Sequence, residues 1–148
     1  MKFLIVSGMF VSFSVMAVCP NLAGEYTSCR SQSGELTSGS TISQEMTNGV
    51  TTYTVVSIDD ESGSEVTETF IADGVVRADT FPDPSGEITI ASLASCQGNA
   101  LVLDLKVFSE FQEFANLHFQ IIKIGHQITT LTTGTASGGQ VNDTEVCL

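Results

Sequence analysis

The clearest pattern in the chain is a regular alternation of apolar and polar positions in two consecutive segments. In residues 100–108 the apolar positions 101, 103, 105 and 107 face away from Asp104 and Lys106, and residues 116–124 repeat the arrangement with His118 and Gln120 as the polar positions. Side chains of a strand point alternately to the two faces of its sheet, so each segment predicts a strand with one buried and one solvated face. The predicted inward set is Leu101, Leu103, Leu105, Leu117, Phe119 and Ile121.

Turn signals divide the rest of the chain into segments rich in Thr, Val, Ile, Tyr and Phe, the residues that favour strands. Asn48-Gly49 and Asp73-Gly74 are typical of two-residue hairpin turns, because both residue types tolerate positive φ. Residues 81–86 contain two prolines and predict a loop. Residues 108–114 predict one helical turn or a wide loop. The expected strands are residues 23–31, 39–47, 50–58, 65–72, 75–81, 87–96, 100–108, 116–124, 127–135 and 140–147.

The order and spacing of these segments predict an all-β fold. Every connection is short enough for a hairpin, and about ten strands exceed what one open twisted sheet usually carries. We therefore expect an up-and-down antiparallel meander barrel of about 8–10 strands. A β-sandwich is the alternative.

The first 17 residues predict a secretory signal peptide. Lys2 precedes a broken apolar stretch, and Val15-Met16-Ala17 fits a signal-peptidase site. A membrane anchor and lipidation of Cys19 are the alternatives. We expect residues 18–148 to form a single secreted or periplasmic domain, with no membrane span after cleavage of the signal.

All four cysteines follow the expected cleavage site, and an even number in an exported chain predicts two disulfides. In a ten-strand meander the strands that end at Cys96 and Cys147 finish on the same rim. This favours Cys96 with Cys147, which leaves Cys19 with Cys29. Cys19 with Cys147 is the rival pairing. The spacing of the cysteines does not fit zinc, so no metal site is expected.

The balance of charge restricts the partners. The sequence has 17 acidic and five basic side chains, and its formal net charge is −12. This charge opposes binding to nucleic acid and suits a cationic protein partner. His118 and His126 are the sole histidines, and no nucleophile motif accompanies them. We therefore expect no catalytic residue, no cofactor and no enzymatic activity.

The segment Asn21-Leu22-Ala23-Gly24-Glu25-Tyr26 resembles the opening of lipocalins and related calycin barrels, in which Leu-x-Gly-x-Trp begins the first strand. Tyr26 stands in the place of the tryptophan. The family's late arginine, which packs on that tryptophan, has no counterpart that the sequence assigns. The resemblance implies a barrel that binds small apolar molecules.

These observations predict a secreted, non-enzymatic binding protein that holds a small hydrophobic ligand in a calycin-like barrel. The alternative is an acidic protein-interaction, inhibitor or envelope module with a filled core. In the first case the inward set of residues lines the ligand site, because wide barrels hold a cavity where side chains do not fill it. In that case we also expect a cluster of Phe108, Phe111 and Phe114 at the mouth of the cavity, where it would control access to the ligand site.

Overall fold

The computed structural model describes residues 18–59, 62–84, 86–110 and 112–148, and the expected signal peptide lies outside these ranges. All regular structure in the described residues is β-strand, as the alternation predicts. The strands are β1 (Gly24–Arg30), β2 (Leu36–Thr47), β3 (Val50–Ile58), β4 (Glu65–Ile71), β5 (Arg77–Asp83), β6 (Gly86–Gln97), β7 (Ala100–Ser109), β8 (Gln112–Ile124), β9 (Gln127–Ala136) and β10 (Gly139–Cys147). No helix among the described residues has the length and apolar character needed to cross a membrane.

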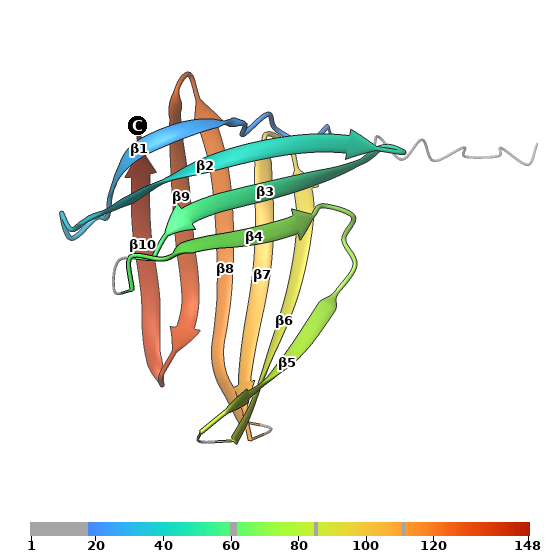
Figure 1. The fold of residues 1–148 in the computed structure, drawn as a ribbon, viewed down its shortest axis with the longest axis vertical. Helices are drawn as coiled ribbons and strands as arrows, with labels where there is room; N and C mark the ends of the chain where they lie inside the picture. The colour runs from blue at the N-terminus through green and yellow to red at the C-terminus, as the bar shows by residue number, and fades with distance from the viewer. Residues whose placement is uncertain (1–17, 60–61, 85, 111) are drawn as a thin grey trace, which may run out of the picture.

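The ten strands form one antiparallel sheet in the order β4-β3-β2-β1-β10-β9-β8-β7-β6-β5. The predicted up-and-down meander is confirmed, and the sheet curls into a half-barrel. Figure 1 shows β1–β4 crossing over one end of the upright strands β6–β10. The first and last strands pair with each other, whereas β4 and β5 are the two edges of the sheet. The half-barrel is therefore open between β4 and β5.

The connection between β4 and β5 explains the opening, and the predicted hairpin at Asp73-Gly74 is wrong. The backbone N–H of Gly74 donates to the carbonyl of Ala94 on β6 at 2.9 Å, so the chain crosses to β6 instead of turning back on β4. The Asp73 carboxylate accepts hydrogen bonds from the Val75 N–H at 3.0 Å and from Nη1 and Nη2 of Arg77 at 2.9 and 2.7 Å. These hydrogen bonds lower the pKa of Asp73 to about 2, and those from Arg77 have the largest effect.

Two other local predictions are also wrong. Residues 81–83 continue β5, because an edge strand tolerates a proline where its missing N–H is not needed by a neighbour. The described residues 108–110 and 112–114 form neither a helical turn nor a wide loop. β7 and β8 are joined there by a tight hairpin in which Glu110 has φ 50°, with an irregularity in register between Val107 and Phe108. The partner changes there from Ala115 to Glu113, so β8 has one more residue than β7, as in a β-bulge.

The core joins the N-terminal segment and β1–β3 to the upright strands, and its buried members are Leu22, Tyr26, Cys29, Ile42, Tyr53, Ala94, Leu101, Ile128 and Cys147. Leu22, Tyr26 and Tyr53 are at most 3% exposed. Both hydroxyls are used: Tyr26 donates to the carbonyl of Leu22 at 2.8 Å, and Tyr53 donates to that of Pro20 at 2.6 Å. Burial raises the pKa of Tyr53 to about 12. These bonds hold residues 18–23 against the sheet.

The disulfides join Cys19 to Cys96 and Cys29 to Cys147. Both predicted pairings are therefore wrong. Three strands separate β6 from β10, and four steps of about 4.8 Å each place Cys96 and Cys147 too far apart for a disulfide. Cys29 instead faces Cys147 in the β1–β10 ladder, and the N-terminal segment brings Cys19 to β6. Two disulfides are typical of an oxidising, extracellular-type compartment.

Candidate functional site

The inner face of the half-barrel is built on the alternation of β7 and β8. The register places Leu101 opposite Ile121, Leu103 opposite Phe119 and Leu105 opposite Leu117. Residues directly opposite each other in an antiparallel pair share a face of the sheet. The predicted inward set is therefore brought together on one face.

A cavity of about 470 Å³ lies inside the half-barrel. Its volume is within the range of pockets that bind small molecules. Every strand except β5 contributes to its wall, so the cavity is a product of the whole curled sheet. Its lining residues are Cys29, Thr37, Ser38, Ser40, Ile42, Val55, Ser57, Ile58, Glu68, Phe70, Ser92, Leu103, Asp104, Leu105, Phe119, Ile121, Ile128, Thr130, Glu145 and Cys147.

Four of the predicted site residues line this cavity: Leu103, Leu105, Phe119 and Ile121. Leu101 belongs to the buried core, with 2% of its surface exposed, and Leu117 is half-buried beside Leu105.

Two of the three phenylalanines of the predicted cluster, Phe108 and Phe114, are not among the residues that line the cavity. Phe108 borders a separate hollow of about 460 Å³ with Glu87, Thr89 and Glu110. Phe114 is 53% exposed on β8 and is not among the lining residues. Phe111 lies outside the described residues. The described phenylalanines at positions 108 and 114 therefore give no support for a cluster at the mouth of this cavity.

Sequence reasoning missed the opposite wall of the cavity, which comes from β2, β3 and β4. Its apolar members include Ile42, Val55 and Phe70. In β2 the inward positions read Ser38, Ser40 and Ile42, so hydroxyls interrupt the apolar alternation. A period-2 search that accepted Ser and Thr as inward residues would have found this wall.

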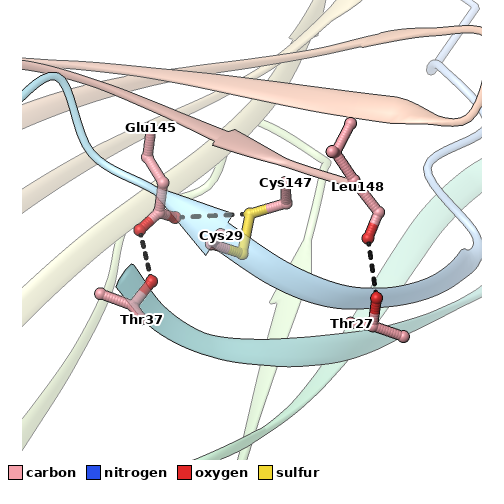
Figure 2. Close-up of a disulfide and its surroundings, with 6 residues drawn as sticks. All are labelled: Thr27, Cys29, Thr37, Glu145, Cys147 and Leu148. Atoms are coloured by element: carbon pink, nitrogen blue, oxygen red, sulfur yellow. Dashed lines mark hydrogen bonds between the residues drawn. A yellow bond between two sulfur atoms is a disulfide. The ribbon is translucent and has the colours of Figure 1, made fainter. Parts of the chain in front are cut away.

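Glu145 is a half-buried acidic residue of the cavity wall, beside the disulfide of β1 and β10. Figure 2 shows its carboxylate between Thr37 and the disulfide sulfurs. The hydroxyl of Thr37 donates to Oε2 at 3.0 Å, and Oε1 lies 3.6 Å from Sγ of Cys147. A second carboxylate, from the exposed residue Glu68, lines the cavity from the edge strand β4. The interior is therefore apolar with an acidic part.

Two other groups of potentially reactive side chains lie close together in the described part of the chain. Asp104 Oδ1 and His118 Nδ1 are 2.7 Å apart, as a cross-strand pair in which both side chains are 49% exposed. Cys29, Glu145 and Cys147 have the spacing of metal ligands within the described chain. Their two sulfurs are joined in a disulfide, so the thiolates that would bind a metal do not exist.

No protein-family model, curated protein or solved structure matches this chain. The cavity and the residues around it are therefore the basis of the function proposed below.

Proposed function

We propose that the protein is a secreted, non-enzymatic carrier that holds a small apolar molecule inside the half-barrel. The observation that carries this proposal is the cavity of about 470 Å³, whose lining includes the apolar side chains of Leu103, Leu105, Phe119 and Ile121. A filled interior would have left no room for a ligand. Apolar pockets of this size bind ligands by removing apolar surface from water.

The packing around Tyr26 supports a calycin-like origin. The ammonium of Lys123 lies 5.7 Å from the centroid of the Tyr26 ring, within the range of a cation–π interaction. It also donates to the carbonyl of Ala23 at 2.7 Å. A cation late in the chain thus packs on the aromatic residue of the first strand, and this contact is similar to that of the late arginine and the tryptophan in lipocalins and related calycin barrels. The disulfides and the expected signal peptide fit secretion.

The test is a titration of the oxidised protein with a fluorescent fatty-acid or retinoid-like probe. We expect saturable binding that is at least tenfold weaker in Phe119→Asp, because the carboxylate would be placed in the apolar wall. Phe114→Asp is the matched control, since it makes the same change on the same strand at a site 53% exposed. Circular dichroism and thermal melts establish that both variants fold. Absence of saturable binding, or equal weakening in both variants, would contradict the proposal.

An acidic protein-interaction module is the second candidate, favoured by the open edges of the sheet. β4 is an edge strand, paired with β3 on one side only, and it carries Glu65 and Glu68, both exposed. Such an edge can pair with an extended segment of a partner, and its charge suits a cationic one. This candidate predicts capture of a lysine-rich peptide that weakens as salt rises, and capture indifferent to salt would argue against it.

A further inference from the structure

The charged side chains among the described residues that line the cavity are all acidic. Glu68 and Glu145 contribute carboxylates, and no lysine, arginine or histidine is among the described residues that line it. Asp104 also borders the cavity, but its carboxylate oxygen Oδ1 is within hydrogen-bond distance, 2.7 Å, of Nδ1 of His118. The interior therefore offers negative charge without a positive counterpart.

Three basic side chains, Arg77, Lys106 and Lys123, make their contacts away from the two cavity carboxylates. Arg77 binds Asp73, and Lys106 lies 3.5 Å from Glu113. Lys123 binds the carbonyl of Ala23 on the N-terminal segment. None of these cations neutralises the two cavity carboxylates. A ligand that carries its own positive charge would do so.

Most hydroxyls of the cavity wall lie on β2 and β3, where they alternate with the apolar Ile42 and Val55. Hydroxyls of Thr37, Ser40 and Ser57 come from β2 and β3, and Glu145 lies within 3.0 Å of the Thr37 hydroxyl. The side chains from β7 and β8 that face them are apolar, except for the bonded Asp104. A molecule with a hydrocarbon body and a polar head can therefore satisfy both sides at once.

The sign of the head follows from electrostatics. A carboxylate or phosphate head would lie beside carboxylates with no cation to offset the repulsion, whereas an alcohol head would gain no ion pair. An ammonium head gains a charge-assisted hydrogen bond, and the net charge of −12 raises the local concentration of cations around the protein.

We propose that the natural ligand is a cationic amphiphile, an apolar amine whose ammonium group pairs with the half-buried Glu145, in the field of the second cavity carboxylate Glu68, while its hydrocarbon body contacts Phe119 and Leu105. This inference rests on the proposed carrier function and names the chemical class of the ligand.

The experiment compares three competitors with the same tail, dodecylamine, dodecanol and dodecanoate, each displacing a neutral fluorescent apolar probe. All are used below their micelle-forming concentrations. We expect dodecylamine to displace the probe at about one fifth of the concentration that dodecanol needs, because a solvent-accessible ion pair contributes about 1 kcal/mol to binding. Dodecanoate should be the weakest competitor. The advantage of the amine should shrink as salt rises.

The variants are Glu145→Gln and Glu68→Gln, with Glu25→Gln as the matched control. Glutamine removes the charge but keeps an oxygen that can accept the Thr37 hydrogen bond. Glu25 is exposed on β1, is not among the lining residues, and loses the same charge. We expect either cavity variant to reduce the preference for the amine about two- to fivefold, with probe affinity unchanged, and the control to keep it.

The outcomes separate this inference from the carrier function. If all three competitors displace the probe equally, or if dodecanoate is the best, the cationic class is wrong and the carrier function stands. If the amine preference is equal in all three variants, the carboxylates do not supply it and the inference fails. If neither the probe nor any competitor binds, both proposals fail.

Discussion

The junction between the first and last strands depends on a disulfide more than on its ladder. The β1–β10 ladder contains two residue pairs, whereas the neighbouring β1–β2 ladder contains six. Cys29 and Cys147 form one of these two pairs and are 3% and 5% exposed. We expect this bond to hold the two halves of the sheet together around the cavity.

The entropy of ring closure gives the magnitude. Cys29 and Cys147 are 118 residues apart, but the Cys19–Cys96 bond provides a shorter path. This path has 10 residues from Cys19 to Cys29 and 51 from Cys96 to Cys147, a ring of about 61 residues. Closing such a ring stabilises the folded state by about 4 kcal/mol. That is a large part of the roughly 5–15 kcal/mol by which domains are stable.

The control comes from the chain itself, because removing Cys19–Cys96 opens a ring of the same length. The double variants Cys29→Ser/Cys147→Ser and Cys19→Ser/Cys96→Ser should each lose about 4 kcal/mol of unfolding free energy in guanidinium chloride. The first should lose more, since its two-pair ladder then stands alone.

Hydrogen exchange locates this additional loss. The amide of Thr27 donates to Leu148 at 2.8 Å, and the amide of Leu148 donates to Ser28 at 3.0 Å. Both amides should exchange faster in the variant that lacks Cys29–Cys147 and keep their protection in the other. A loss below about 1 kcal/mol, or equal exchange in both variants, would refute the account of the junction.

Two further predictions concern the backbone and pH. Gly134→Ala should destabilise the protein by about 2 kcal/mol or more, because the φ of Gly134 is 140° and the added Cβ would overlap the carbonyl oxygen of Asn116. Gly139→Ala is the control. Its added Cβ would have an ordinary contact of 3.6 Å with the carbonyl oxygen of Ala136, so the melting temperature should change little. Stability should fall as pH rises from about 10 to 12, because Tyr53 then ionises in the unfolded chain before it ionises in the folded one. The fall should be smaller in Tyr53→Phe, and an equal slope in urea titrations of both proteins would contradict it.

The strands were predictable because their signals are local. The period-2 alternation and the turn residues place ten strands within a few residues of their observed bounds. The inward direction of Leu103 and Phe119 follows from the same alternation.

The edge of the sheet and the pairing of the cysteines were not predictable in this way. Asp73-Gly74 has the residues of a hairpin, but a backbone bond from Gly74 to Ala94 on β6 decides where the chain goes. Cys96 and Cys147 were paired because their strands end at the same rim of the sheet, but the number of strands between them sets their distance along that rim.

The sequence by itself determined an all-β meander with one apolar face, since side-chain alternation and turn chemistry depend on neighbours in the chain. Tertiary structure decided that the sheet stays open between β4 and β5, that Cys29 meets Cys147, and that Glu68 and Glu145 share the interior with Phe119. These features bring together residues far apart in sequence. Their positions depend on how the whole sheet curls, and no local pattern records that curvature.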